Sequence, residues 1–327
     1  MEISFATNIL AVNVLLFIAG LALLIKGCDF FIDAAAQIAR EFKIPEIVIG
    51  LTLVSIGTSL PEFATDVYAS VKGQGDIVIG DLVGSNITNI ALVLGIAVLL
   101  TGKMAIPRHL VKRDALFMLG SFFLFAGIAF ICNGILPRWS GIILLFLMGG
   151  YLIYLFKNRD ALAELEEGEE HEEPAFKTLN GAWLFLVIGL VMIFFGAKTM
   201  VDNVIYVADR LHLNKALISA TVVAFGTSVP ELAVTIGSVI KNKKAIALGN
   251  IIGSCIFNLV LIMGLCIVIN PVPVAREILY VINPIMILCG VMLVTFMRTG
   301  WRLVRFEGII FLLTYIGFII YNAVKVG

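Results

Sequence analysis

Two six-residue stretches decide the fold, Gly57-Thr58-Ser59-Leu60-Pro61-Glu62 and Gly226-Thr227-Ser228-Val229-Pro230-Glu231. The offset that places Gly57 on Gly226 also aligns the sequence around them without a gap. Between positions 57 and 90, more than a third of the positions are identical to their partners, and the identities concentrate in Gly, Pro, Ser, Glu and Asn. Two unrelated apolar stretches would not share such residues in register. The chain is therefore predicted to be an internal duplication.

The composition predicts a membrane protein. The 327 residues are 60% hydrophobic and 14% charged, and the mean hydropathy is +1.05, whereas soluble domains carry about 25% charged residues. Ten apolar runs of roughly 18–28 residues are each long enough to cross a hydrocarbon core of about 30 Å. They lie near 7–27, 44–71, 77–101, 110–132, 138–157, 180–201, 213–240, 245–270, 276–297 and 303–324. The predicted fold class is an all-α polytopic membrane protein with ten transmembrane helices.

The duplication and the span count together predict inverted repeats. Each half contains five spans, so the second half enters the membrane from the opposite side, and a binding site is expected near the midplane. The predicted units are residues 1–157 (spans one to five), the acidic linker 158–179 and residues 180–327 (spans six to ten). The linker carries seven glutamates around His171. A regulatory calcium sensor is an alternative, but the linker lacks the Gly-assisted turn with spaced ligands of such loops, which favours a solvated cytoplasmic linker.

The distribution of Lys and Arg predicts the orientation. Of the 23 such residues, 16 lie on the side that receives the linker and 7 on the other side. The positive-inside rule places the linker in the cytoplasm and both termini outside, in a multi-pass protein of the inner (cytoplasmic) membrane. The leader before the first run contains Glu2 and no basic residue, which indicates a true span rather than a signal peptide.

Other partners are not indicated by the composition. The basic residues are scattered along loops, so no nucleic-acid surface is predicted. The five cysteines lie in or beside apolar spans without metal-ligand spacing, and no cofactor is predicted. The lipid bilayer is the expected environment.

Glu62 and Glu231 lie near mid-depth of their apolar runs, where a carboxylate costs several kcal/mol unless it is paired, protonated or faces a polar cavity. No Lys or Arg lies near this depth, so a mobile cation is the simplest counter-charge. Pro61 and Pro230 interrupt their helices and free backbone carbonyls. Hydroxyl oxygens stand at the same breaks, on Thr58, Ser59, Thr227 and Ser228. Na⁺ and Ca²⁺ favour this mixture of oxygen ligands.

The following span of each half supplies further polar groups. Ser85 and Asn89 share one helix face, as do Ser254 and Asn258. Small-xxx-small glycine pairs, Gly80 with Gly84 and Gly249 with Gly253, allow close helix packing. This packing is expected to bring each Asn beside the Glu of its own half. An alternative is that these Ser and Asn side chains only hydrogen-bond between helices.

The paired motifs GTSLPE with GSNITN and GTSVPE with GSCIFN resemble the two alpha-repeats of the cation/calcium exchanger superfamily, in particular its prokaryotic sodium/calcium exchanger branch. The resemblance covers nearly the whole chain. It implies a secondary antiporter, not an enzyme, that exchanges Na⁺ for Ca²⁺ by alternating access, with the first and sixth spans moving over spans 2, 3, 7 and 8. It further implies a diamond of Glu62, Asn89, Glu231 and Asn258, with sodium sites completed by Thr58, Ser59, Ser85, Thr227, Ser228 and Ser254.

Several alternatives stay open. Some exchangers of this branch have Asp where this chain has Asn258, so the diamond carries about −2 rather than −3 and the sodium coupling is less specified. A proton-coupled cation antiporter on the same fold is the main alternative. An intramembrane hydrolase is a remote one, because all three histidines lie in loops. A passive channel is a further alternative, but channel pores are commonly built by oligomeric symmetry, whereas the internal pseudo-symmetry makes a closed central site in one chain. Asp66 and Asp81 have the neutral repeat partners Thr235 and Asn250, and they are interpreted either as an entry vestibule or as interfacial polar residues. A monomer suffices for this scheme, and the sequence does not specify the oligomeric state.

Overall fold

The computed structural model describes residues 10–157, 175–210 and 228–326. Within these ranges eight helices are long and apolar enough to cross a membrane, and a ninth span results if the bent pair Glu46–Thr58 and Leu60–Val71 is counted as one. The all-α polytopic fold class is confirmed. The expected seventh span, 213–240, lies partly outside the described residues, and its described part is the shorter apolar helix α13 (Val229–Ile240).

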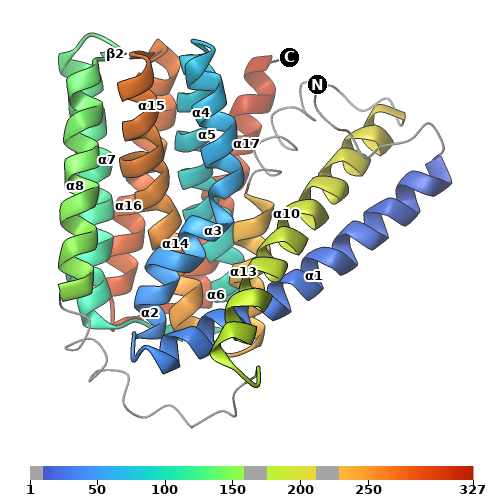
Figure 1. Cartoon of the computed structure of the whole chain (residues 1–327). Coiled ribbons are helices and arrows are strands. Elements are labelled where there is room, and N and C mark those ends of the chain that lie inside the picture. The colour runs from blue at the N-terminus through green and yellow to red at the C-terminus, as the bar shows by residue number, and fades with distance from the viewer. Residues whose placement is uncertain (1–9, 158–174, 211–227, 327) are drawn as a thin grey trace.

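Two long helices, α1 (Leu10–Glu41) and α10 (Leu179–Arg210), lie side by side as a tilted pair next to the other helices (Figure 1). They run in opposite directions and pack closely at glycines. A Cβ on Gly189 would lie 2.7 Å from the Phe31 nitrogen, and one on Gly196 would lie 2.6 Å from the Leu24 nitrogen. Only glycine allows two helix backbones to approach this far.

The first half continues through a series of short segments. These are α2 (Glu46–Ile49), a π-helical turn (Gly50–Val54), α3 (Ser55–Thr58), α4 (Leu60–Val71), α5 (Gly75–Ile87), a second π-helical turn (Thr88–Leu94) and α6 (Gly95–Thr101). The second half has the counterparts α13, α14 (Lys244–Ile256), a π-helical turn (Phe257–Ile262) and α15 (Met263–Ile269). Helices α4 and α13 begin at equivalent positions of the repeat, as do α5 and α14. In Figure 1, α4 lies toward the upper end and α13 toward the lower end, as an inverted repeat requires.

The outer helices of each half follow with a smaller offset. In the first half they are a π-helical turn (Leu110–Ala115), α7 (Leu116–Ile131) and α8 (Arg138–Lys157); in the second half they are Ile278–Ile282, α16 (Asn283–Arg298) and α17 (Arg305–Val326). If the offset that places Gly57 on Gly226 applied here as well, α16 would start at Ile285 and α17 at Glu307. Both helices begin earlier, at Asn283 and Arg305. The gap-free offset therefore holds only through the central helices.

Two short antiparallel ribbons join the halves. Strand β1 (Lys103–Ala105) pairs with β4 (Arg302–Val304), and β2 (Ile135–Leu136) pairs with β3 (Val272–Pro273). Each ribbon thus takes one strand from each half, and together they satisfy backbone groups at helix ends that would otherwise lack partners.

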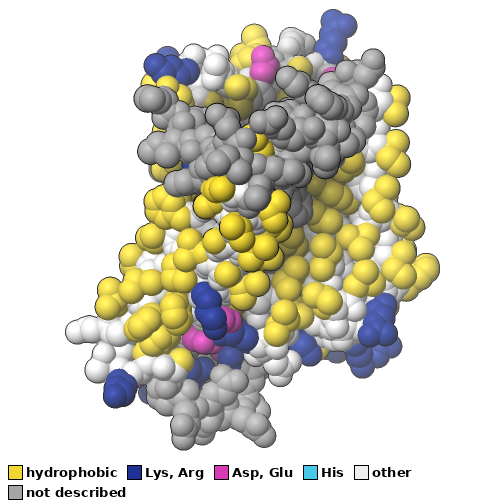
Figure 2. Space-filling model, turned by 90° about the vertical axis from the view of Figure 1, so that its right-hand side faces the viewer, with side chains coloured by type: hydrophobic (Ala, Val, Ile, Leu, Met, Phe, Trp, Pro, Cys, Tyr) yellow, Lys and Arg dark blue, Asp and Glu magenta, His cyan; other side chains and the backbone are white. Residues whose placement is uncertain are grey.

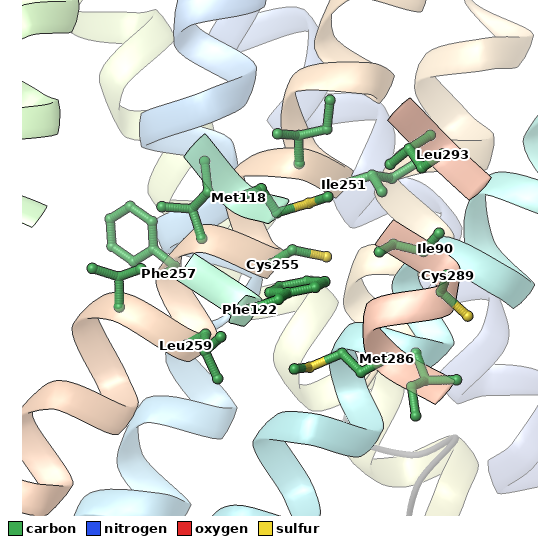
Figure 3. Packing of buried hydrophobic residues seen from close by; sticks show 14 of the residues in the cluster. Ile90, Met118, Phe122, Ile251, Cys255, Phe257, Leu259, Met286, Cys289 and Leu293 are labelled. Atoms are coloured by element: carbon green, nitrogen blue, oxygen red, sulfur yellow. The ribbon is translucent and has the colours of Figure 1, made fainter. Parts of the chain in front are cut away.

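The two central spans are shielded by the others. In Gly75–Thr101 and Lys244–Ile269, 83% of the residues in an apolar 18-residue window are buried, against 28–44% in the other described spans. Figure 3 shows the packing on one side, where Phe122 of α7, Cys255 of α14 and Met286 of α16 belong to one cluster of buried side chains. On the outside, hydrophobic side chains cover the middle of the face in Figure 2, and Lys and Arg lie toward its ends. This distribution matches a bilayer-embedded surface.

Candidate ion-binding site

The two Pro-Glu motifs produce the same local geometry. Helix α3 ends at Thr58, Ser59 leaves helical geometry at φ −87° and ψ 10°, and α4 begins at Leu60 after a bend of 52°. Ser228, which precedes α13, has φ −87° and ψ 5°. Pro61 and Pro230 lie in the first turn of their helices, where the missing N–H costs no hydrogen bond. Glu62 and Glu231 therefore each lie in a helix first turn, where the dipole stabilises negative charge.

Both carboxylates are buried and only partly satisfied. Glu62 and Glu231 are each 1% exposed, and one oxygen of each, Oε2, has no hydrogen-bond partner among the described residues. The Ser59 hydroxyl donates to Oε1 of Glu231 at 2.9 Å. A residue at the helix break of the first half thus donates a hydrogen bond to a carboxylate of the second half. Two buried acids with unpartnered oxygens favour a bound cation as their counter-charge.

The predicted Ser and Asn residues are also buried without partners. Asn89 and Asn258 are 1% and 0% exposed, and no amide atom of either has a partner in the described parts of the chain. The hydroxyls of Ser85, Ser254 and Ser228 are likewise unpartnered there. Buried polar atoms nearly always hydrogen-bond, and each exception costs about 1–3 kcal/mol. Buried polar atoms without partners recur at equivalent positions of the two halves, which is the pattern expected where a bound ion is the missing partner. They argue against the alternative that these side chains only hydrogen-bond between helices.

Thr58 takes part in a network that joins the halves. Its hydroxyl donates to Oδ1 of Asn250 at 3.1 Å, and the Asn250 amide donates to Oγ1 of Thr235 at 3.1 Å and to the Glu231 carbonyl at 3.4 Å. Sequence reasoning assigned no role to Asn250. The sequence did contain a signal, because Asn250 is a polar residue in an apolar span and aligns in the repeat with an acid, Asp81. Thr227, the counterpart of Thr58, lies outside the described residues.

The expected glycine contacts are found in the second half. A Cβ on Gly249 would lie 2.6 Å from the Ile47 carbonyl, and one on Gly253 would overlap the Ser55 hydroxyl and lie 2.7 Å from the Leu51 carbonyl. For Gly80 and Gly84 no described atom lies within 4 Å, because the equivalent partner segment falls within the undescribed residues 211–227. No hydrogen bond joins either Asn to the Glu of its own half among the described residues, so that pairing stays a prediction.

A cavity of about 350 Å³ lies beside the break in the first half. Its lining includes Thr58, Pro61 and Thr65 from α3 and α4, Leu190 and Phe194 from α10, and Pro230. The polar break therefore borders an open space next to the tilted pair of α1 and α10.

Comparison with known proteins gives a consistent result. A family model described as "Sodium/calcium exchanger protein" matches residues 12–157 and 181–324. The sodium/calcium exchanger MaX1 of Methanosarcina acetivorans is 35% identical, over 95% of this chain and 98% of that relative. The inner membrane protein YrbG of Escherichia coli (strain K12) is 36% identical, over 78% of this chain and 79% of that relative.

A solved structure is also similar. The sodium-calcium exchanger NCX_Mj, soaked with 2.5 mM Na⁺ and 10 mM Sr²⁺, has 32% sequence identity and a TM-score of 0.79, over 94% of this chain and 98% of that chain.

A broken helix and paired buried carboxylates, inside a polytopic α-helical membrane protein, are features of a secondary ion transporter. The chain belongs to the sodium/calcium exchanger family, in the prokaryotic branch of the cation/calcium exchanger superfamily.

Proposed function

We propose that the protein is an antiporter that exchanges Na⁺ for Ca²⁺ at the buried site between its two halves, residues 1–157 and 180–327. The observation that carries this proposal is the pair Glu62 and Glu231, each 1% exposed, each in the first turn of a helix and each with one oxygen that no described residue partners. Two carboxylates balance the charge of one Ca²⁺. The names of MaX1 and NCX_Mj describe sodium/calcium exchangers, which supports the same pair of ions.

The neutral ligands support the coordination of a metal cation at this site. A proton binds to a single oxygen, whereas Ca²⁺ takes six to eight oxygen ligands. The hydroxyls of Ser85 and Ser254 and the amide oxygens of Asn89 and Asn258, unpartnered within the described ranges, provide such oxygens at two equivalent positions. Their burial without partners among the described residues is explained by metal coordination, and the experiment below decides between Na⁺ and H⁺ as the driving ion.

The exchange is proposed to proceed by alternating access, with α1 and α10 moving against the remaining helices. Their closely packed pair lies to one side of the bundle (Figure 1), while two β ribbons and the shielded central spans tie the rest together. We place the protein in the inner membrane, with the linker 158–179 in the cytoplasm and both termini outside. The charge asymmetry of the sequence supports this orientation, as does the position of the ends of α8 and α17 at opposite ends of the molecule.

The deciding experiment is ⁴⁵Ca²⁺ uptake into proteoliposomes loaded with Na⁺, compared with vesicles loaded with K⁺ or choline, with and without an imposed pH gradient. Uptake that requires internal Na⁺ and ignores the pH gradient is expected. Uptake driven by the pH gradient alone would establish the proton-coupled alternative. Glu62→Gln and Glu231→Gln should each abolish uptake while the purified protein still elutes as a monodisperse peak. Near-normal exchange by either variant would remove that carboxylate from the mechanism.

A further inference from the structure

Each half has a lysine directly after its Pro-Glu helix. Lys72 follows α4, Lys241 follows α13, and the two are partners in the repeat. Their backbone angles are nearly the same, with φ −81° and ψ 0° at Lys72 and φ −79° and ψ 8° at Lys241. The two ammonium groups nevertheless make different contacts. Because the lysines leave their helices in the same way, this difference comes from the helices of the tilted pair, α1 and α10.

Lys241 joins α13 to α1. Its ammonium lies 2.7 Å from Asp33 Oδ1 and 3.4 Å from Asp29 Oδ1, and it donates to the Asp29 carbonyl at 3.1 Å. A cavity of about 490 Å³ lies between α1 and α13, and Asp29 and Lys241 both belong to its lining. The ion pairs therefore connect the two helices where α13 ends, on the side that the proposed orientation assigns to the cytoplasm.

Lys72 makes no such connection to α10. Its ammonium lies 5.6 Å from the Tyr68 ring centroid, and no ion pair joins it to α10 in the described structure. On α10 the repeat partners of Asp29 and Asp33 are Lys198 and Asp202, and the Lys198 ammonium lies 3.4 Å from Asp202 Oδ2. The cavity of about 350 Å³ between α4 and α10 has no charged side chain in its described lining. Figure 1 shows the tilted pair close to α13 at its lower end and diverging from α4 toward its upper end.

We propose that two repeat-equivalent ion pairs close the two sides of the protein in turn. The cytoplasmic latch is Lys241 with Asp33 and Asp29, and the external latch is Lys72 with Asp202. Inverted repeats exchange their arrangements when access alternates, so a contact made by one half is expected in the other half in the opposite state. The proposal rests on the alternating access of the proposed function. The latch residues touch no transported ion and act as positioning residues.

The two latches differ in strength because one charge is reversed. In the cytoplasmic latch Lys241 meets two acids. In the external latch Lys72 would meet one acid, Asp202, which already pairs with Lys198, and the two ammonium groups would repel each other. The ion-free protein therefore rests with the cytoplasmic latch closed and the external side open.

Two matched disulfide reporters can measure which side is closed. A Cβ on Gly237 would lie 3.6 Å from the Cys28 Cβ, within the range of about 3.5–4.5 Å that a disulfide requires. Gly237→Cys with native Cys28 thus reports closure of α1 on α13. The repeat partners of these positions are Tyr68 and Ala197, so Tyr68→Cys with Ala197→Cys reports closure of α10 on α4. All other native cysteines are replaced, including Cys28 in the second reporter.

The assay is the rate of disulfide formation with copper phenanthroline in the purified full-length protein, without Na⁺ or Ca²⁺. Free thiols are counted by mass spectrometry after alkylation. The reporter of α1 on α13 should form its disulfide fast, and the reporter of α10 on α4 should form it slowly. The slow reporter is the sensitive one, because its rate follows the population of the minor state.

Charge changes at the latches should alter the slow reporter in both directions. Lys241→Gln should raise its rate roughly tenfold, as expected for the loss of two accessible ion pairs and a hydrogen bond. Lys241→Arg retains the charge and should stay near the parent rate. Lys198→Asp, which copies Asp29, should also raise the rate, because the external latch gains an acid and loses a repelling charge. Lys72→Gln should lower it.

Equal rates for the two reporters in the parent would overturn the resting preference. An unchanged slow reporter in Lys241→Gln would show that its ion pairs do not hold the protein closed. An unchanged rate in Lys198→Asp or Lys72→Gln would rule out the external latch, and absence of the second disulfide from every variant would show that α10 does not close on α4. Because the disulfides form without ions or transport, failure of Na⁺/Ca²⁺ exchange in proteoliposomes is a separate result that bears on the proposed function.

Discussion

An ionic contact holds α1 against α13, and its loss should expose a buried cysteine. The Lys241 ammonium, at the end of α13, lies 2.7 Å from Asp33 Oδ1 and 3.4 Å from Asp29 Oδ1, and it donates to the Asp29 carbonyl at 3.1 Å. The repeat partner of Lys241 is Lys72, at the end of α4, whose ammonium lies 5.6 Å from the Tyr68 ring centroid. No ion pair joins Lys72 to α10 in the described structure, so only one of the two equivalent contacts is formed there.

The magnitude follows from the exposure of these groups. The Lys241 side chain is 23% exposed and its partners are 35% and 37% exposed. Ion pairs this accessible to solvent contribute roughly 0.2–1 kcal/mol each, and the hydrogen bond to the carbonyl adds about 1 kcal/mol. At the low end of these ranges, Lys241→Gln should weaken the contact of α1 with α13 by about 1.4 kcal/mol. Since about 1.4 kcal/mol is a factor of ten, separation of the two helices should become roughly tenfold more frequent.

Cys28 reports this separation directly. It is 4% exposed and faces α13, where a Cβ on Gly237 would lie 3.6 Å from the Cys28 Cβ. The assay is the rate of maleimide labelling of Cys28, after the other four cysteines are replaced. Lys241→Gln should label roughly tenfold faster than the parent. Lys72→Gln is the matched control and should label at the parent rate. Equal rates for Lys241→Gln and the parent, or the same acceleration in Lys72→Gln, would refute the reasoning.

Three further predictions concern packing, the site and orientation. Gly253→Ala should lower the Tm, because its Cβ would overlap the Ser55 hydroxyl and overpacking costs about 1–3 kcal/mol. The control Gly127→Ala should leave the Tm unchanged, because no described atom lies within 4 Å of its Cβ. Equal Tm values for the two variants would contradict the close approach at Gly253. Ser59→Ala removes a charge-assisted hydrogen bond of about 1.5–3 kcal/mol and should weaken ⁴⁵Ca²⁺ binding by roughly tenfold or more; unchanged affinity would mean that the bond to Glu231 is broken when the ion is bound. Single cysteines near Gly168 and Lys243 should be shielded from impermeant thiol reagents in intact cells and one near Gly327 should label, whereas external labelling at Lys243 would reverse the orientation.

The central part of the fold could be predicted because chemistry is repeated there. Pro61 and Pro230 impose the same restriction on the backbone, so Ser59 and Ser228 share nearly identical dihedral angles and α4 and α13 have equivalent bounds. Glu62 and Glu231, acids that recur in register within apolar runs, predict the site. Beyond α6 the repeat has no such paired markers. The sequence alone therefore did not reveal that the offset between the halves shortens before α7 and α16 begin.

Contacts between the halves could not be predicted, because they depend on how two similar units pack. The sequence assigned Ser59 to the site but did not indicate that its hydroxyl binds Glu231. It likewise placed Asn250 only as the neutral partner of an acid, whereas this side chain connects Thr58 to Thr235. The strand pairs β1–β4 and β2–β3 are too short to leave a periodic pattern.

The residues that break the repeat decide how the two halves differ in function. If the halves were identical, exchange of their conformations would give two states of equal energy. The proposed cycle would then have no built-in preference for either state. The structure shows two departures from this symmetry. Lys241 contacts two aspartates on α1. On α10 the position equivalent to Asp29 is Lys198, whose ammonium lies 3.4 Å from Asp202. The acidic pair Asp66 and Asp81 likewise has only neutral counterparts. Both departures place charged groups on one side alone, so the two states of the proposed cycle are expected to differ in energy even before an ion gradient acts.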